Sequence, residues 1–155
     1  MTSSPLLLSR RTLLGAAIAS ALVPSLAAAQ QGTDLKTQKT DMRARFSFSD
    51  QVMTATLYDN PSARDFYSLL PLDLTIENYG RNEKITYLPR KLTEEGSGFF
   101  GNEQPYDLCY FMPWGNLAMF YADYKYPGLI RLGRFEEGYQ ALHIPGEFPL
   151  KIDAI

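Results

Sequence analysis

The 155-residue sequence contains one cysteine, Cys109, and one histidine, His143. One cysteine cannot form an internal disulfide, and this pair, distant in the sequence, lacks the ligand spacing of a zinc site. The sequence also lacks a GxSxG motif, a P-loop and a dinucleotide-binding fingerprint, so we expect no cofactor. Cys109 lies in an apolar segment without a basic neighbour, which predicts a buried, inert thiol. We expect His143 to be structural or at the surface rather than a catalytic base.

Long hydrophobic runs are also missing. The longest, residues 13–23, is shorter than the roughly 20 residues that span a bilayer. It follows Arg10-Arg11 and precedes the small residues 27–29, which is the order of a cleavable twin-arginine export signal. An amphipathic helix of the fold is the alternative, but this run contains almost no polar residues. We therefore predict a signal peptide at residues 1–29, no lipid or membrane anchor after cleavage, and a periplasmic or secreted domain.

The sequence has no excess of positive charge. Without the two signal arginines, 13 basic residues face 17 acidic ones, which gives a net charge near −4. This balance provides no electrostatic reason to bind nucleic acid or an anionic membrane surface. The remaining 126 residues are the length of one domain, and we expect a monomer.

What the sequence does contain is a series of short alternating segments that predict β-strands. One clear helix interrupts them: Asn60 is a good N-cap, Pro61 suits the first turn, and an apolar stripe runs to Leu70. We expect a disordered leader at residues 30–42 and one mainly β domain at 43–155. The expected strands are 43–48, 52–58, 72–77, 83–88, 106–112, 117–121, 129–135, 141–144 and 148–152.

The segment 105–121, PYDLCYFMPWGNLAMFY, is the centre of this prediction. Two apolar and aromatic runs flank Pro113-Trp114-Gly115-Asn116, which is typical of a β-hairpin. Neither face of the first run is polar enough for water, so we expect both strands to be covered on both sides. A small domain covers them in this way when its sheet closes into a barrel or a helix caps it. Gly133, inside strand 129–135, predicts a bend or a close approach of a neighbouring chain segment.

Three segments together resemble the bacterial cyclophilin-like proteins of uncharacterised function. They are NYGRNEKITYLPRKL at 78–92, the 105–121 hairpin, and LIRLGRFEEG at 129–138. The resemblance covers residues 43–138 and implies a closed or nearly closed β-barrel with one capping α-helix. The Gly that usually precedes Asp107 in that family is absent here, and Arg81-Asn82 replace a second small residue in the loop after Tyr79.

Prolyl isomerisation by true cyclophilins depends on an arginine beside a phenylalanine-lined pocket and a glutamine. The Phe-His or Phe-Asn signature closely followed by that arginine is not found in this sequence. Arg45, Arg131 and Arg134 lie on predicted strands but not in the matching context. No catalytic residue is therefore assigned, and fold alone does not establish activity.

The candidate ligand-binding residues lie around the Trp114 turn and the Glu83-Lys84 pair. Adjacent residues on a strand face opposite sides, so one of the pair would reach a pocket and the other solvent, unless both are merely solvated. The aromatic cluster could equally be core, and Asn116 could serve the turn alone. The full candidate set is Tyr79, Glu83, Lys84, Tyr110, Trp114, Asn116, Phe120 and Arg131.

The sequence leaves three functions open. The first hypothesis is a domain that binds a small-molecule or peptide ligand beside Trp114, without chemistry of its own. A divergent peptidyl-prolyl isomerase is the alternative, and it requires a hydrogen-bond donor aimed at the prolyl amide. A scaffold domain is the third, and it would have a wide exposed apolar patch in place of a concave site.

Overall fold

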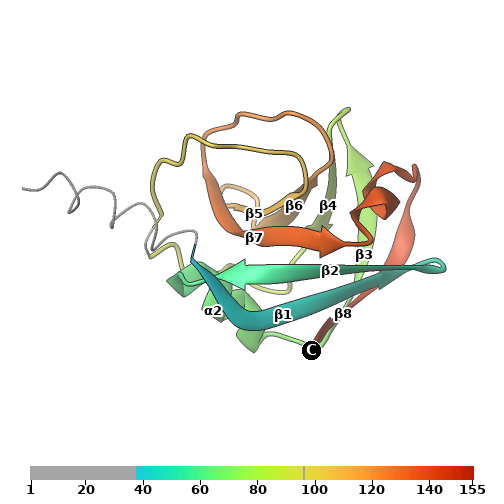
Figure 1. The fold of residues 1–155 in the computed structure, drawn as a ribbon, viewed down its shortest axis with the longest axis horizontal. Helices are drawn as coiled ribbons and strands as arrows, with labels where there is room; N and C mark the ends of the chain where they lie inside the picture. The colour runs from blue at the N-terminus through green and yellow to red at the C-terminus, as the bar shows by residue number, and fades with distance from the viewer. Residues whose placement is uncertain (1–37, 96) are drawn as a thin grey trace, which may run out of the picture.

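The computed structural model describes residues 38–95 and 97–155, so the predicted signal peptide and most of the predicted leader lie outside the described residues. In this part of the chain eight antiparallel strands close into a barrel in the order β1-β2-β7-β5-β6-β4-β3-β8 (Figure 1). The prediction of a mainly β barrel with one α-helix is confirmed for these residues. The strands are β1 Lys39–Phe48, β2 Gln51–Tyr58, β3 Leu72–Tyr79, β4 Glu83–Tyr87, β5 Asp107–Phe111, β6 Asn116–Phe120, β7 Leu129–Glu137 and β8 Phe148–Ala154.

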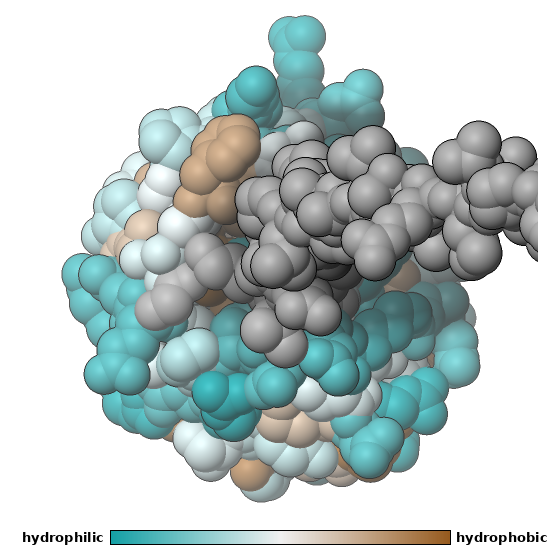
Figure 2. All heavy atoms as spheres, turned by 60° about the vertical axis from the view of Figure 1, so that its left-hand side comes forward, coloured by the Kyte–Doolittle hydropathy of each residue, from teal (hydrophilic) through white to brown (hydrophobic). Residues whose placement is uncertain are grey.

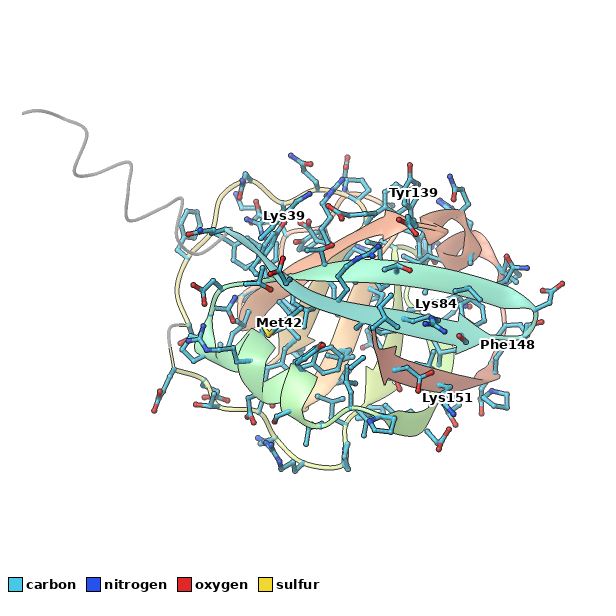
Figure 3. All side chains as sticks on the ribbon, turned by 60° about the horizontal axis from the view of Figure 1, so that its bottom comes forward. Lys39, Met42, Lys84, Tyr139, Phe148 and Lys151 are labelled. Atoms are coloured by element: carbon cyan, nitrogen blue, oxygen red, sulfur yellow. The ribbon has the colours of Figure 1, made fainter. Side chains whose placement is uncertain are left out.

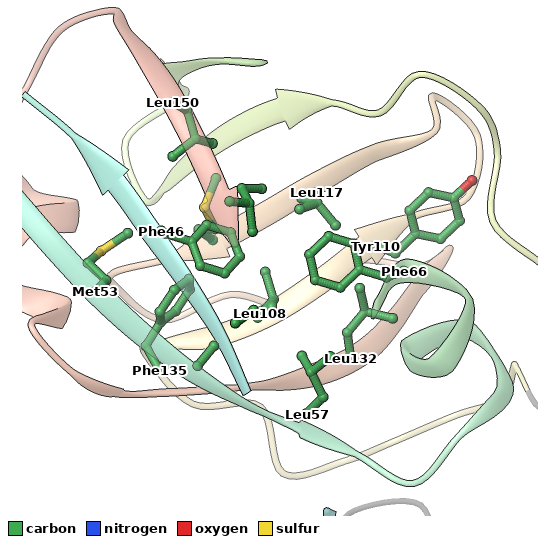
Figure 4. Close-up of a cluster of buried hydrophobic side chains, with 14 of the residues drawn as sticks. Phe46, Met53, Leu57, Phe66, Leu108, Tyr110, Leu117, Leu132, Phe135 and Leu150 are labelled. Carbon is green, nitrogen blue, oxygen red and sulfur yellow. The ribbon is translucent and has the colours of Figure 1, made fainter. Parts of the chain in front are cut away.

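The interior of the barrel is filled by side chains from every strand, as strand alternation requires. Phe46 packs edge-on against Phe135, with ring centroids 5.1 Å apart, and Figure 4 shows both rings pointing into the core. From the central hairpin, Leu108 and Tyr110 of β5 and Leu117 of β6 point into the same core. The interior is therefore a packed hydrophobic core and not a channel.

The helix α2, Pro61–Ser68, covers one end of the barrel (Figure 1). The Asn60 side chain accepts a hydrogen bond from the Ala63 backbone N–H at 2.8 Å, which satisfies an otherwise unpaired donor of the first turn. Its amide also donates to the Arg131 carbonyl of β7 at 3.0 Å. Ala63 and Phe66 are fully buried against the core, as the apolar stripe predicts.

The main departure from the predicted elements follows β7. The segment predicted as a strand at 141–144 is part of a 3-10 helix, η2, Tyr139–His143. Gly138 precedes it with a φ of 67°, and a Cβ there would lie against the Val52 carbonyl oxygen. The chain turns away from the sheet at this glycine, and Ala141 and Leu142 pack onto the end of the barrel opposite α2 (Figure 1).

The first strand also begins earlier than predicted. β1 starts at Lys39, so residues 39–42 of the predicted leader belong to the barrel. The pairing of Lys39 with Tyr58 of β2 places them there, and a register shift separates them from the regular ladder that starts at Arg43. Alternation is interrupted at that irregularity, so the pattern alone placed the start of the strand too late.

The central hairpin is covered on both faces, as predicted. β5 and β6 are buried along almost their whole length. The face opposite the barrel core carries a second hydrophobic cluster of Cys109, Ala118, Phe120, Tyr124 and Leu129, with Phe100 and Phe111 against it. The long connections before β5 and after β6 supply Phe100 and Tyr124. This second cluster lies on the outer face of β5, β6 and β7, so it covers the side of the hairpin that points away from the barrel core.

Candidate functional site

A pocket of about 650 Å³ lies on the outer face of the barrel, beside the Trp114 turn. Its floor is formed by β4 and β6, which pair with Glu83 opposite Phe120, Ile85 opposite Ala118 and Tyr87 opposite Asn116. Its volume is within the range of small-molecule sites. The lining residues of this Trp114 pocket are Tyr79, Gly80, Arg81, Asn82, Glu83, Ile85, Phe111, Trp114, Asn116, Phe120, Tyr126, Pro127 and Leu129.

Aromatic rings form the walls of the Trp114 pocket. The Trp114 ring lies edge-on to Tyr79 and to Phe111, with centroid distances of 5.4 Å in both cases. Phe120 stacks on Tyr124 at 3.7 Å, which fixes its ring from behind. Trp114 is 49% exposed although it belongs to this cluster. A half-exposed indole held by two other rings gives a flat apolar wall that a ligand can reach.

Glu83 brings a buried carboxyl group to this apolar site. The residue is 8% exposed, and its carboxylate has no ion pair or hydrogen bond within residues 38–95 and 97–155. Burial raises the pKa of Glu83 to about 7, because the low-dielectric surroundings disfavour the charged form. At neutral pH the protonated and ionised forms are therefore both populated. Such a carboxyl group in a concave site is a candidate functional group.

Asn116 lies at the other end of the pocket floor. Its side-chain NH₂ donates to the Leu117 carbonyl at 3.0 Å, and the residue is 2% exposed. No donor among the described residues reaches its side-chain oxygen. Buried amide oxygens are normally hydrogen-bonded, so this one is an acceptor that the described residues leave unsatisfied at the pocket floor.

Lys84 faces the opposite way from Glu83, into the barrel interior (Figure 3). Its ammonium donates to the Asn78 side-chain oxygen at 2.8 Å and lies 5.8 Å from the ring centroids of Phe48 and Phe148. Burial lowers the pKa of Lys84. The expectation that one residue of the pair reaches solvent was therefore wrong, because the inward position on a closed barrel leads to the core.

Tyr110 and Arg131 also lie away from the Trp114 pocket. Tyr110 points into the core, and its hydroxyl accepts the Leu92 backbone N–H at 3.1 Å. Arg131 lies on the outer face but is held by Asp107 at 3.3 Å and by the Asn102 side-chain oxygen at 2.6 Å. Five of the eight candidates line the pocket, namely Tyr79, Glu83, Trp114, Asn116 and Phe120.

Asp107 is the centre of a buried polar cluster next to the pocket. Its carboxylate accepts hydrogen bonds from Arg134 at 3.1 Å and from the Tyr124 hydroxyl at 2.7 Å, in addition to the Arg131 ion pair. The Tyr124 oxygen lies 3.5 Å from the Cys109 sulfur. Burial raises the pKa of the Cys109 thiol, which agrees with its prediction as inert. This Asp107 cluster uses both arginines that could have served an isomerase.

Several pocket residues were not among the sequence candidates. Arg81, Ile85, Phe111, Tyr126 and Leu129 reach the site from three strands and two connections. The alternation of β4 places Ile85 on the same face as Glu83, so the sequence pattern alone was sufficient to identify Ile85 as a pocket residue. Phe111 and Leu129 required the pairing of β5 with β7, where they lie opposite each other. No local pattern specifies that pairing.

The profile of the cyclophilin-like family matches residues 46–153. The chain belongs to this cyclophilin-like family. Among solved structures, the chain is similar to a hypothetical protein of Archaeoglobus fulgidus, with a TM-score of 0.61 and 16% identity over 75% of this chain and 96% of that one. That likeness supports the fold alone. No curated protein matches the sequence.

The cyclophilin-like domain offers no metal site in its described part, where no three His, Cys, Asp or Glu side chains gather. Nor is any described helix long and apolar enough to cross a membrane. On the face shown in Figure 2, hydrophilic side chains predominate and hydrophobic atoms form small separate areas. The Trp114 pocket, with its aromatic walls and buried carboxyl group, is the feature of the described residues on which we base a function.

Proposed function

We propose that this cyclophilin-like domain binds a small-molecule or peptide ligand in the Trp114 pocket, without chemistry of its own. The observation that carries the proposal is a concave aromatic site that contains a buried carboxyl group without a partner among residues 38–95 and 97–155. Leaving Glu83 buried destabilises the fold, and a partner in the pocket would offset that cost. The aromatic walls supply apolar contact area, and the few polar atoms orient the bound group.

The isomerase alternative needs a donor directed at a prolyl amide. Arg131 and Arg134 both hydrogen-bond to Asp107, and neither lines the pocket. Arg81 does line it, but from the exposed turn between β3 and β4. Ligand binding therefore agrees with the aromatic walls and the buried carboxyl group of the pocket, whereas isomerisation lacks its donor there in the described part of the chain.

The proposal is tested by a ligand-observed NMR screen of small fragments of positive, neutral and negative charge. We expect fragments to bind the wild type and to lose binding in Trp114→Ala. Val52→Ala is the control, because Val52 is 55% exposed, against 49% for Trp114, and lies on β2 outside the pocket. If no fragment binds, or if Trp114→Ala binds as well as the wild type, the proposal fails.

Two further measurements address the natural ligand and the rival activity. Mass spectrometry of the natively exported protein would identify a molecule that co-purifies with it. A proline-peptide isomerisation assay would reveal catalysis, and a rate above background that Trp114→Ala removes would replace binding with the enzyme.

We further propose that the domain acts outside the cytoplasm after removal of residues 1–29. This part of the proposal is supported by the Arg10-Arg11 pair, the apolar run and the small residues that follow it in the sequence.

A further inference from the structure

The polar atoms that the pocket floor leaves without partners are both acceptors. They are the carboxylate of Glu83 and the side-chain oxygen of Asn116, and both residues are more than nine-tenths buried. Neither receives a hydrogen bond from residues 38–95 or 97–155. When Glu83 is ionised, a ligand that satisfies both must carry donors, since an acceptor at either place would leave two lone pairs facing each other.

The register of the sheet fixes the spacing of these two acceptors. Glu83 lies opposite Phe120 and Asn116 lies opposite Tyr87, so four residue steps separate the two along the β4–β6 ladder. Four steps correspond to roughly 13 Å between Cα atoms. Side chains stand nearly perpendicular to a sheet, so one donor group does not reach both acceptors. The ligand is elongated, with one donor at each end.

Between the two acceptors the site is apolar. Ile85 and Ala118 form the middle of the floor, and both are almost completely buried. Phe120 lies opposite Glu83, and the Trp114 ring lies edge-on to Tyr79 and Phe111. A ligand body that fits this stretch is hydrophobic, and a ring suits the aromatic walls.

The charges around the site favour a cation at Glu83. The charged side chains that line the pocket are Glu83, which is buried, and Arg81, which is exposed in the turn. Water screens an exposed charge more than a buried one, so the carboxylate has the larger influence on a buried ligand. Aromatic faces around a site add further attraction for an ammonium group.

We propose that the Trp114 pocket binds a primary amine, whose ammonium group pairs with Glu83, whose apolar body lies over Ile85, and whose far end donates an N–H to Asn116. This inference rests on the proposed binding function and specifies the class of its ligand. An amino-terminal peptide and a free arylalkylamine share this chemistry.

Proton release on binding distinguishes an amine ligand from a neutral or an anionic one. The groups that face Glu83 are Tyr79 from β3, Arg81 and Asn82 from the turn, and Tyr126 from the connection after β6, while β6 presents the uncharged Phe120. The neighbouring carboxylate, Asp107, is already paired with two arginines. An ammonium group at Glu83 favours its ionised form, so binding below about pH 7 releases a proton from this carboxyl group.

The test compares three indoles of the same ring and nearly the same length by isothermal titration calorimetry. Tryptamine is cationic, N-acetyltryptamine is neutral and indole-3-propionate is anionic. At about pH 8 we expect tryptamine to bind at least about tenfold more tightly than either analogue. In Glu83→Gln, and in the wild type at about pH 5, this preference should fall below about twofold.

The same titrations test the orientation of the ligand and the integrity of the variant. Methylation of the indole nitrogen of tryptamine should weaken binding to the wild type and have no effect in Asn116→Ala. Retained binding of N-acetyltryptamine by Glu83→Gln shows that the variant keeps its pocket. At about pH 6, tryptamine binding measured in buffers of different ionisation enthalpy should show proton release in the wild type and none in Glu83→Gln.

Either of two results overturns the amine assignment. One is that indole-3-propionate or N-acetyltryptamine binds as tightly as tryptamine at about pH 8. The other is that none of the three indoles binds at millimolar concentration. If uncharged or anionic fragments nevertheless bind in the earlier screen, only the ligand class is wrong and the proposed function stands. A tripeptide amide with a free amino terminus tests whether the natural ligand is a peptide or a free arylalkylamine. If it binds more tightly than tryptamine, and its acetylated form does not, the ligand is an amino-terminal peptide.

Discussion

Glu83 and Lys84 show how neighbouring residues of one strand can have unrelated roles. Glu83 faces the Trp114 pocket without a partner in the described part of the chain, whereas Lys84 is enclosed in the barrel and donates a hydrogen bond to Asn78. Both charges are buried, but only the lysine has its hydrogen-bonding group satisfied by the fold. A ligand that donates a hydrogen bond would therefore stabilise the buried carboxyl group, whereas the ammonium group already has its partner.

The first prediction concerns the pH dependence of stability. Burial raises the pKa of Glu83 from 4.5 to about 7. Below pH 4.5 both folded and unfolded states hold the proton, and between 4.5 and about 7 only the folded state keeps it. The wild type should therefore lose up to about 3 kcal/mol relative to Glu83→Gln as pH rises through this range. Urea unfolding of both proteins at several pH values measures the difference.

The exposed Glu147 supplies the matched control. Glu147→Gln should follow the wild type across the whole pH range. A constant difference between wild type and Glu83→Gln would mean that the Glu83 carboxyl group is not desolvated in the folded protein.

The second prediction concerns the Asp107 cluster. Asp107→Asn removes the charge that holds Arg131 and Arg134, and it leaves Arg131, whose side chain is 6% exposed, without its counter-ion. We expect a loss of about 3–5 kcal/mol in the free energy of unfolding. Arg43→Gln, which breaks the exposed pair with Glu137, should cost less than about 1 kcal/mol. Equal effects of both substitutions in chemical denaturation would contradict the central role of Asp107.

The sequence predicted some residue positions correctly and could not predict others. The alternation of 106–112 placed Leu108 and Tyr110 on one face and Cys109 and Phe111 on the other, as the structure has them. It could not state which face is the interior of the barrel, because both are apolar. Tyr110 was a pocket candidate for that reason, although it lies in the core.

Helix α2 was the element best defined by its sequence, because its N-cap, its proline and its apolar stripe all agree. The third prediction tests this start. Asn60→Ala removes the acceptor for the Ala63 N–H and the donor to the Arg131 carbonyl. We expect a loss of about 1–2 kcal/mol, and Asn60→Asp should also lose stability, because its carboxylate still caps the helix but turns an oxygen toward the Arg131 carbonyl. Thermal unfolding followed by circular dichroism would measure both variants.

Gly133 shows where two strands approach closely. A Cβ at this position would lie 2.3 Å from the Thr56 carbonyl oxygen of β2, so the backbones must separate to admit it. The fourth prediction is that Gly133→Ala destabilises the domain by at least about 2 kcal/mol or prevents folding. Gly101→Ala is the comparison, because a Cβ there would meet only the ring of Phe99, which is exposed and can move. A yield and melting temperature equal to the wild type would show that β2 and β7 can move apart.

The 141–144 segment shows the limit of a short apolar run. Such a run fits a buried strand and a buried helical turn equally well, because four residues are too few to establish a period. Gly138 decides between them, since its positive φ directs the chain away from the sheet. The strand pairings of β5 with β7 and β2 with β7 are likewise products of the closed topology and not of any local sequence.

Export is predicted from the sequence alone. In the fifth prediction, Arg10→Lys and Arg11→Lys together should leave most of the protein in the cytoplasm as an uncleaved precursor. Cell fractionation with immunoblotting measures this, with a periplasmic protein of the general secretion route as control. Normal cleavage of the double variant would mean that the twin-arginine route is not used.

The closed order of the strands has a consequence for any peptide partner. β1 pairs with β8, and every other described strand has a neighbour on each side, so no described strand has an entirely free edge. A peptide therefore finds no whole strand edge for β-augmentation, in which main-chain hydrogen bonds supply affinity without regard to side chains. We expect recognition on this domain to read the end groups and side chains of its partner, so that short molecules compete with long ones.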